Sequence, residues 1–327
     1  MKVVIPVAGK GTRLLPLTNH VPKPLIRVAG RPVMDYVIDK LDGLDIEELI
    51  FITGHLKDQV ESHVTKNYGL PSRFVEQVVQ DGTAGAINLA KPYVDGPVLI
   101  IFVDTLFDAD LTLVNRVDAD GVMWVKEVED YQRFGVVVTD DQGNMIRIVE
   151  KPSDPISKLA NIGLYYVRDW KTLFDGIQDT LARPQNKGEW YLTDAFQYMI
   201  DRGCKIKTAE VGGWYDCGKL ETVLETNRHL LENGRAMRPS VPDGVVIVDP
   251  VRIADDVDLD ECTIGPNVTI EEGAVVRGSV IKEAIIGRAA RVQDSNLEQV
   301  LVGDRTEVVG RTGTRLIAAG AEIDDAP

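Results

Sequence analysis

The sequence contains few cysteines and no long apolar run. Its three cysteines, Cys204, Cys217 and Cys262, are scattered without a C-x-x-C pair, which argues against a disulfide framework and against a zinc site. No apolar stretch approaches the roughly 18 residues that a membrane span needs, and the apolar run at residues 3–7 soon meets a glycine. These absences predict a soluble protein without an export signal, and we expect a cytoplasmic location.

Acidic residues are missing from the N-terminal stretch, although the chain as a whole is acidic. The 36 Lys and Arg residues face 51 Asp and Glu residues, and the net charge of -15 is a poor match for nucleic acid or an anionic membrane. Six basic residues nevertheless precede Asp35, the first acidic residue. This local excess predicts a site for a small polyanion, although chance clustering would account for the charges alone equally well.

The length and the apolar pattern predict two domains, the first of them α/β. A chain of 327 residues exceeds the usual size of one hydrophobic core. Short apolar runs alternate with helix-like segments, which is typical of a Rossmann-like α/β sheet with mostly parallel strands. A hairpin at residues 135–149 makes the predicted sheet mixed. The strands are expected at residues 3–7, 49–52, 98–103 and 121–125, and later helices at 193–202 and 220–232.

The C-terminal region shows a six-residue apolar beat, which resembles the hexapeptide repeat of the left-handed parallel β-helix. An ordinary β-domain is the alternative. No histidine lies beyond Arg238, so an acyl-transfer site with a histidine base is not expected there. We therefore expect the α/β domain over 1–238 and a structural, regulatory or oligomerising β-helix over 239–327. The beat runs through Ile264, Ile270 and Val276, then Ile286 and Val292, then Val302 and Val308, and it slips between Val276 and Ile286.

A glycine-rich loop follows the first predicted strand. Gly9 and Gly11 bracket a lysine and precede Thr12 and Arg13, and such glycines let backbone N–H groups approach a phosphate. Leu14 stands where a dinucleotide-binding loop would need a third small residue. The spacing of a Walker A loop is also absent. Neither of these two nucleotide-binding loops therefore explains the motif.

The loop continues to Lys23, which lies between Pro22 and Pro24. The prolines stiffen the backbone around Lys23 and so reduce the freedom that its side chain loses on meeting a phosphate. Together with the G-x-G-T-R loop, this segment resembles the sugar-1-phosphate nucleotidylyltransferase family, and glucose-1-phosphate thymidylyltransferases in particular. The resemblance implies that Arg13 and Lys23 are catalytic cations that bind the nucleotide phosphates.

Further motifs match the same family in order along the chain. The segments around Gln77 and around residues 81–86 resemble its base-recognition region. The resemblance implies a nucleotide site that comprises Gly9, Gly11, Thr12, Arg13, Gln77 and Gly82, in which the Gln77 carboxamide reads the base edge. It implies a sugar-phosphate site that comprises Gly135, Glu150, Lys151 and Asn161.

Two aspartates match the metal ligands of that family. Asp104 is expected at the end of the buried strand 98–103, and Asp216 lies in a W-x-D-x-G motif. The resemblance implies that they hold Mg²⁺, which prefers oxygen ligands and shares them with substrate phosphates. Asp104 would then also be catalytic. Val103 and Lys219 stand where many relatives have glycine and threonine, so contacts beside both aspartates differ.

The resemblance implies an enzyme that joins a nucleoside triphosphate, dTTP or UTP, to a hexose 1-phosphate, glucose 1-phosphate above all. A mannose-1-phosphate guanylyltransferase is the alternative within the class, because residues 82–86 also resemble relatives that use guanosine nucleotides. A catalytically silent, nucleotide-sensing scaffold subunit is the alternative of another class. Because parallel β-helices commonly associate side by side, we also expect a homo-oligomer.

Overall fold

The computed structural model describes residues 1–325, and these form two compact units. The first, here named the sheet unit, comprises Met1–Gly9 and Val37–Trp214. The second, the β-helix unit, comprises Lys10–Tyr36 and the residues from Tyr215 onward. No helix in the described part of the chain is both long and apolar enough to cross a membrane.

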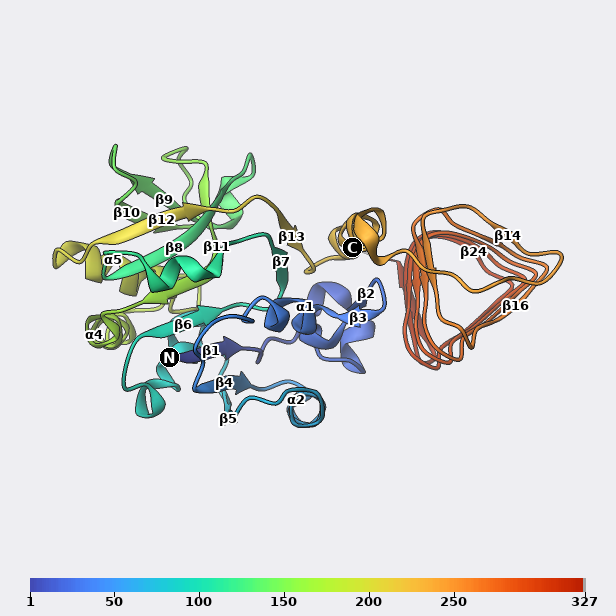
Figure 1. The fold of residues 1–327 in the computed structure, drawn as a ribbon, viewed down its shortest axis with the longest axis horizontal. Coiled ribbons are helices and arrows are strands. Elements are labelled where there is room, and N and C mark those ends of the chain that lie inside the picture. The colour runs from blue at the N-terminus through green and yellow to red at the C-terminus, as the bar shows by residue number, and fades with distance from the viewer. Residues whose placement is uncertain (326–327) are drawn as a thin grey trace. The chain divides into compact units, whose positions relative to one another are not determined.

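The sheet unit is built on a mixed sheet with the strand order β10-β9-β11-β6-β1-β4-β5, to which β8 and β12 are added beside β11 (Figure 1). β1 pairs in parallel with β4 and β6, whereas β11 runs antiparallel to β6, so the predicted mixed sheet is confirmed. The strands are β1 (Lys2–Pro6), β4 (Glu48–Thr53), β5 (Ser72–Glu76), β6 (Val98–Ile101), β7 (Thr105–Phe107), β8 (Gly121–Glu127), β9 (Gly135–Thr139), β10 (Met145–Glu150), β11 (Leu159–Val167) and β12 (Ile206–Glu210).

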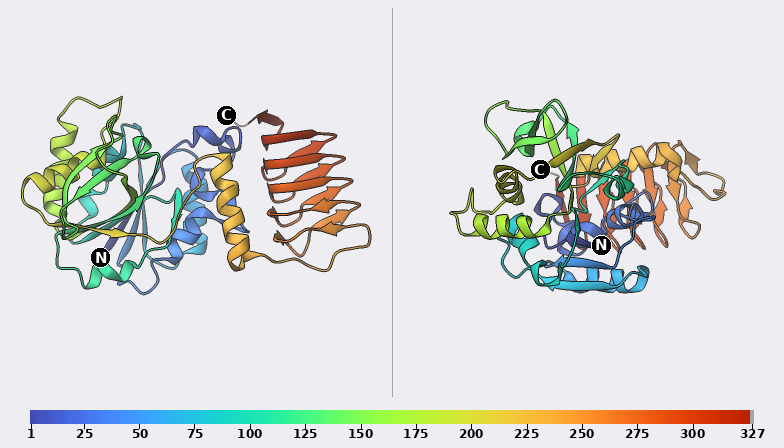
Figure 2. Two further views of the ribbon diagram at one scale, coloured as in Figure 1. Left: turned by 90° about the horizontal axis from the view of Figure 1, so that it is seen from above. Right: turned by 60° about the vertical axis from the view of Figure 1, so that its left-hand side comes forward.

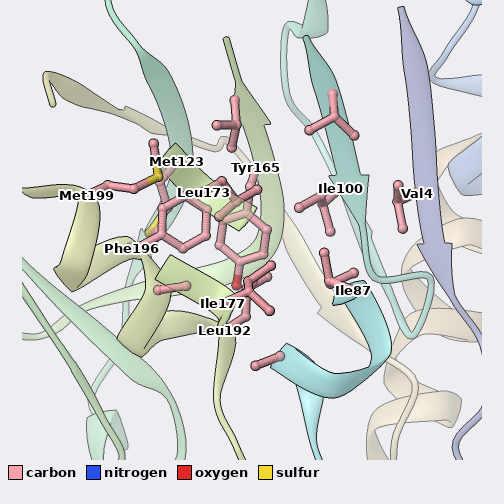
Figure 3. Packing of buried hydrophobic residues seen from close by; sticks show 14 of the residues in the cluster. Val4, Ile87, Ile100, Met123, Tyr165, Leu173, Ile177, Leu192, Phe196 and Met199 are labelled. Carbon is pink, nitrogen blue, oxygen red and sulfur yellow. The ribbon is translucent and has the colours of Figure 1, made fainter. Parts of the chain in front are cut away.

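Helices cover this sheet through a shared apolar core. Phe196 of one helix lies 4.9 Å, centroid to centroid, from the ring of Tyr165 in β11, and Met123 of β8 lies beside them (Figure 3). Asp169 caps a second helix by accepting a hydrogen bond from the Thr172 N–H. The helices of this unit are α2 (Lys57–Asn67), α3 (Thr83–Asn88), α4 (Trp170–Leu181) and α5 (Leu192–Asp201), with short helices η4 (Lys91–Tyr93), η5 (Leu111–Asn115) and η6 (Tyr131–Arg133).

The central strand is shorter than predicted. The apolar pattern predicted a strand over residues 98–103, but β6 ends at Ile101 and the Phe102 N–H donates instead to the Gly163 carbonyl. Gly163 has a φ of 78°, and the pairing register of β11 shifts around it. The expectation that Asp104 directly closes this strand was therefore wrong, because Phe102 and Val103 separate the aspartate from Ile101.

The β-helix unit confirms the predicted C-terminal architecture. Parallel strands stack as rungs (Figure 2) and their coils enclose a triangular outline (Figure 1), consistent with a left-handed β-helix. The strands are β14 (Val246–Ile247), β15 (Val251–Ile253), β16 (Asp258–Asp260), β17 (Thr263–Ile264), β18 (Val268–Ile270), β19 (Val275–Arg277), β20 (Val280–Ile286), β21 (Arg291–Gln293), β22 (Asn296–Val302), β23 (Glu307–Val309), β24 (Thr312–Ala319) and β25 (Glu322–Asp325).

The slip in the six-residue beat has a structural cause. Val276 pairs with Val292, so one coil takes 16 residues rather than three times six. The buried residues are six apart on one side, and five apart on the other two, where Ile281 lies between Val276 and Ile286. The bend after Ile281 is made at Glu283, whose φ of 45° is left-handed. All seven residues of the predicted beat are buried.

The N-terminal segment and one long helix complete the β-helix unit. Helix α6 lies alongside the coils, in contact with β18, β20 and β22 (Figure 2). Its first turn is capped at Lys219, whose N–H donates to the Thr222 hydroxyl. The remaining elements are η1 (Thr12–Leu14), η2 (Leu17–Asn19), η3 (Lys23–Leu25), β2 (Arg27–Val28), β3 (Arg31–Pro32), α6 (Leu220–Leu230) and the π-helical turn η7 (Leu231–Arg235), while α1 (Val33–Asp39) and β13 (Trp214–Asp216) span the boundaries between the units.

Substitution of two adjacent valines in β23 tests the prediction that the residues of the six-residue beat point into the β-helix. Val308 is 2% exposed and Val309 is 50% exposed. We expect Val308→Ala to lower the free energy of unfolding by about 2 kcal/mol, because it removes buried methyl groups and leaves a cavity. Val309→Ala is the matched control and should change it by less than about 0.5 kcal/mol. Urea unfolding followed by circular dichroism measures both, and equal losses would contradict the assigned faces.

Candidate functional site

Three of the predicted sugar-phosphate residues meet in the sheet unit. Gly135 of β9 pairs with Glu150 of β10, and Asn161 of β11 donates from Nδ2 to the Gly135 carbonyl over 2.8 Å. A Cβ atom at Gly135 would lie only 2.3 Å from Asn161 Nδ2 and 2.9 Å from Glu150 Oε2. Glycine is therefore required where these two polar side chains converge.

Two residues that the sequence-based interpretation missed hold this cluster in place. The Thr193 hydroxyl donates to Glu150 Oε2 over 3.1 Å, and the Tyr165 hydroxyl donates to Asn161 Oδ1. Asn161 and Tyr165 are four residues apart on β11, a spacing that regular alternation places on one face. The register shift at Gly163 lies between them, so the spacing was only a weak signal in the sequence. Thr193 comes from α5, and nothing in the sequence relates it to Glu150.

Lys151 is oriented by its backbone and by an aromatic neighbour. Its φ of 42° is left-handed, and its N–H donates to the Phe134 carbonyl over 2.9 Å. The ammonium Nζ lies 3.7 Å from Glu150 Oε1, 3.4 Å from the Tyr191 hydroxyl and 4.7 Å from the centroid of that ring. The cation is thus held beside the cluster while its side chain stays partly exposed, as a phosphate ligand requires.

Burial controls the electrostatics of this cluster. Burial raises the pKa of Glu150, although the Lys151 charge and the Thr193 hydrogen bond oppose the rise. Burial also raises the pKa of Asp194, which lies in the first turn of α5. The pKa of Tyr165 is raised by burial and then by the negative charges of Glu150 and Asp104. The negative charges of Asp104 and Glu150 are therefore both felt at Tyr165, and they favour binding of a cation near it.

The donor chemistry of the chain suits Mg²⁺ shared with a ligand. Asp104 is partly buried between β6 and β7. Among the described residues, no group of three or more His, Cys, Asp or Glu side chains could hold a metal ion by itself. Mg²⁺ usually takes only one or two carboxylates and completes its shell with water and substrate phosphates. One or two aspartates, rather than a full protein cage, are what such an ion needs.

Gln77 and Gly82 are joined by hydrogen bonds. Gln77 is largely buried, and its Nε2 donates to Asp81 Oδ1 over 3.0 Å and to the Gly82 carbonyl over 3.4 Å. These two acceptors fix which end of the carboxamide carries the N–H groups. A Cβ atom at Gly85 would lie 2.0 Å from Asp81 Oδ1, so Asp81 packs directly against the backbone of α3.

The two glycines of the predicted nucleotide site that lie in this unit, Gly9 and Gly82, differ in their surroundings. Gly82 has a φ of 113°, and a Cβ there would lie 2.4 Å from the Trp190 carbonyl oxygen. A Cβ at Gly9 would meet nothing within 4 Å. Packing thus demands glycine at position 82 but not at position 9. Open backbone at Gly9 is the property that a phosphate-binding loop requires.

The remaining residues of the predicted nucleotide site lie in the β-helix unit. Gly11 has a φ of 66°, and a Cβ there would lie 2.9 Å from Thr18 Cγ2 and 3.3 Å from Lys23 Cβ. The Thr18 hydroxyl also donates to the Gly11 carbonyl over 3.0 Å. The loop therefore doubles back so that Gly11 and Lys23 are adjacent. Thr12 is exposed beside them.

Arg13 and Asp216 come together in the same unit. A Cβ atom at Gly218 would lie 3.0 Å from Arg13 Nη2 and 2.9 Å from Asp216 Oδ1. The Thr222 hydroxyl of α6 donates to Asp216 Oδ2 over 3.0 Å, a partner that the sequence-based interpretation missed. The glycine of the W-x-D-x-G motif therefore makes room for both charged groups. Because Asp104 belongs to the sheet unit, the pairing of the two aspartates on one metal ion stays a prediction.

The chain combines a mixed α/β sheet, a glycine-containing loop after its first strand and a C-terminal β-helix. A family model described as nucleotidyl transferase matches residues 2–233. The chain therefore belongs to the nucleotidyl transferase family, and the predicted resemblance is confirmed at that level.

Curated relatives are also nucleotidyltransferases by name. The chain is 38% identical to a bifunctional protein GlmU of Methanococcus aeolicus over 76% of its own length and 60% of that relative. It is 31% identical to the low-salt glycan biosynthesis nucleotidyltransferase Agl11 of Haloferax volcanii, covering 91% and 92% of the two chains. It is 29% identical to a glucose-1-phosphate thymidylyltransferase of Streptomyces antibioticus, covering 95% and 85%.

The structural comparison concerns the fold alone. A crystal structure of UDP-glucose pyrophosphorylase complexed with UDP-glucose matches 71% of this chain and 98% of that one. The TM-score is 0.62 at 24% identity. The chain spans about three fifths of the length of the two GlmU relatives from Methanococcus aeolicus and Methanocaldococcus jannaschii.

The raised pKa of Glu150 predicts how stability changes with pH. A buried carboxyl whose folded-state pKa lies above the unfolded value favours folding when protonated, and that contribution is lost as the pH rises through the folded pKa. The melting temperature of the wild type relative to Glu150→Gln should therefore rise as the pH falls from 8 towards about 4.3, the ordinary glutamate pKa.

Differential scanning calorimetry at several pH values measures this difference. Glu127→Gln, at an exposed position at the end of β8, is the control for removing a surface charge. A difference between wild type and Glu150→Gln that stays constant or falls as the pH is lowered would contradict the burial of this carboxyl.

Proposed function

We propose that this protein transfers a nucleotidyl group from a nucleoside triphosphate to a hexose 1-phosphate, giving a nucleotide sugar and pyrophosphate. The observation that carries the proposal is the meeting of Gly135, Glu150 and Asn161, with Lys151 beside them. Hydroxyl-binding groups beside a cation suit a sugar phosphate. Membership of the nucleotidyl transferase family supports the nucleoside triphosphate as the second substrate.

The reaction needs positioning rather than a covalent intermediate. A phosphate oxygen of the sugar 1-phosphate attacks the α-phosphorus, a new P–O bond forms, and the bond to the bridging oxygen breaks as pyrophosphate leaves. We assign Lys151 to the sugar phosphate, and Glu150 and Asn161 to the sugar hydroxyls. Arg13 and Lys23 would then stabilise the charge on the departing pyrophosphate.

The main barrier that these residues lower is the electrostatic repulsion between the two negatively charged substrates. Two unit charges 4 Å apart interact by about 4 kcal/mol at an effective dielectric of about 20, so each well-placed cation offsets a large part of the repulsion between two polyanions. Asp104 and Asp216 would hold Mg²⁺, which when bound supplies further neutralisation of phosphate charge. The backbone of Gly9, Gly11 and Thr12 would bind the triphosphate beside them.

For the base we propose uracil or thymine, with glucose 1-phosphate as the sugar substrate. The Gln77 N–H groups are directed at Asp81 and Gly82, so its carbonyl oxygen is the end that accepts from a base N–H. Uracil and thymine carry such a donor at N3 and cytosine does not. Guanine also carries one, so a mannose-1-phosphate guanylyltransferase is the second candidate, and the glycine-rich segment after Gln77 favours it.

The two parts of the chain are assigned different tasks. We place the nucleotidyltransferase domain at 1–238 and the β-helix domain at 239–327. The four histidines, His20, His55, His63 and His229, all precede the second domain, so we assign it a structural or oligomerising task rather than acyl transfer. A homo-oligomer in the cytoplasm is the proposed state. The functional alternative is a catalytically silent, nucleotide-sensing subunit. A pyrophosphate-release assay distinguishes it from the enzyme.

Pyrophosphate release is the primary test of this function. We expect release from UTP or dTTP with glucose 1-phosphate, dependent on Mg²⁺ and on both substrates, because neither polyanion reacts alone. A coupled pyrophosphatase assay over the four common nucleoside triphosphates and dTTP, each with glucose and mannose 1-phosphates, measures it. A preference for GTP with mannose 1-phosphate would select the alternative enzyme. If no substrate pair gives metal-dependent pyrophosphate release, the proposed enzyme activity is wrong and the catalytically silent subunit is the remaining alternative.

Substitution of each aspartate tests the metal assignment. Asp104→Asn and Asp216→Asn should lower kcat by a factor of at least about 100, since each removes one charged oxygen ligand. Both variants should keep the wild-type circular dichroism spectrum. Asp118→Asn, at an exposed position of the sheet unit, is the control and should keep full activity. Near-normal kcat for either test variant removes that residue from the metal site.

A further inference from the structure

The segment Lys10–Tyr36 carries Gly11, Arg13 and Lys23, yet its contacts place it in the β-helix unit. Apolar side chains of this segment line one pocket together with side chains of the coils. The segment contributes Leu17, Val21, Leu25 and Ile26, and the coils contribute Ile285, Leu301 and Val302. The proposed phosphate-binding residues are therefore carried by a segment that packs on the β-helix.

A buried ion pair also ties this segment to the coils. Arg27, four residues after Lys23, donates from Nε to Glu271 Oε2 over 2.9 Å, and its Nη2 lies 2.7 Å from the same oxygen. The Glu271 side chain is 2% exposed and the Arg27 side chain 19%. Removing Arg27 takes the ion-pair partner from an almost wholly buried carboxylate, whereas Arg27 also lies 3.5 Å from Glu272 Oε1. The pair thus fixes the segment against the coil that follows β18.

Asn227 of α6 makes a second, fully buried connection. Its Oδ1 accepts from the Ala29 N–H over 2.9 Å and from the Thr269 hydroxyl over 2.7 Å. Its Nδ2 donates to the Asn267 carbonyl over 3.2 Å. One carboxamide therefore links the turn between β2 and β3 to the coil containing β18.

The same helix holds the proposed metal ligand of this unit. Thr226, the residue before Asn227, donates from its hydroxyl to the Asp216 carbonyl over 3.0 Å, and Thr222 donates to the Asp216 carboxylate. Helix α6 thus contacts Asp216, the turn at Ala29 and the β-helix coil. A shift of any one of these would disturb the other two.

We propose that Arg27, Asn227 and Glu271 are positioning residues that hold the segment bearing Arg13 and Lys23 in its reactive arrangement, which makes the β-helix a support for catalysis. The proposal rests on the proposed nucleotidyl transfer. It assigns these three residues no contact with substrate. Their removal lowers kcat, because preorganised cations are lost, while the sugar-phosphate residues of the sheet unit are untouched.

The kinetic test compares Arg27→Met, Glu271→Gln, the double variant and Asn227→Leu with the wild type. We expect kcat for pyrophosphate release to fall at least tenfold in each single variant, with the KM for the sugar 1-phosphate changing less than twofold. The double variant should be no worse than the poorer of its two parents, because both lose the same ion pair. Arg27→Lys, which keeps the charge, should recover part of the lost kcat.

The matched control is Arg277→Met, which breaks an ion pair between Arg277 and Asp258 on the outer face of the coils. Both partners of that pair are about half exposed, and neither belongs to the N-terminal segment. This variant should keep the wild-type kcat. It reports what the loss of an arginine from the β-helix does without disturbing the proposed support.

Hydrogen exchange supplies a readout that does not depend on activity. In Glu271→Gln, amides of residues 12–26 should exchange at least fivefold faster than in the wild type, while those of residues 291–309 keep their rates. An active wild type whose Arg27 and Glu271 variants keep kcat overturns this inference, and so does faster exchange throughout the coils, which marks general destabilisation. A wild type without pyrophosphate release overturns the proposed function instead, and unchanged exchange in residues 12–26 then overturns the anchoring by itself.

Discussion

The buried contact between Arg27 and Glu271 is the constraint on which the arrangement of the β-helix unit depends. The two residues are 244 positions apart in the chain. A stretch without acidic residues cannot supply its own counter-charge, so the partner of Arg27 comes from a distant coil. Burial makes this pairing selective, since the Glu271 carboxylate is almost wholly buried and unpaired burial of a charge is costly. The N-terminal segment is thereby fixed while it retains its excess of basic residues.

In the sheet unit, the absence of a side chain at Gly135 allows two polar side chains to lie close together. Glu150 and Asn161 converge on Gly135, where any side chain would collide with them. Hydrogen bonds from Thr193 and Tyr165 then orient both groups. Buried polar groups held in this way keep a single arrangement, which is the condition for recognising hydroxyl groups by position.

Much of the fold was predictable because it follows from periodicity. The succession of short apolar runs and helix-like segments predicted the α/β sheet, and the hairpin at 135–149 made it mixed. The six-residue beat predicted the β-helix. The strand over 98–103 was predicted two residues too long, because the backbone bond between Phe102 and Gly163 has no local signal. The slip in the beat likewise depends on corners such as Glu283, where a non-glycine residue adopts a left-handed conformation only in the context of the stacked coils.

The residues of the candidate site were predictable from the sequence, but the partners that orient them were not. Resemblance to a family predicted a site of Gly135, Glu150, Lys151 and Asn161. The structure brings these residues together, while their role stays a prediction. The supporting residues were not identified, since Thr193 and Glu271 act through contacts between distant segments. Side-chain chemistry at a motif is visible in a sequence, whereas its partners depend on the tertiary fold.

The identity of the product tests the central claim most directly. Phosphorus NMR of a reaction with Mg²⁺, UTP or dTTP and glucose 1-phosphate distinguishes every outcome by chemical shift. Nucleotidyl transfer predicts equal amounts of a new sugar-linked diphosphate and of inorganic pyrophosphate, with sugar 1-phosphate consumed in step. Formation of nucleoside monophosphate or inorganic phosphate without the sugar-linked product, or an unchanged spectrum, would contradict it.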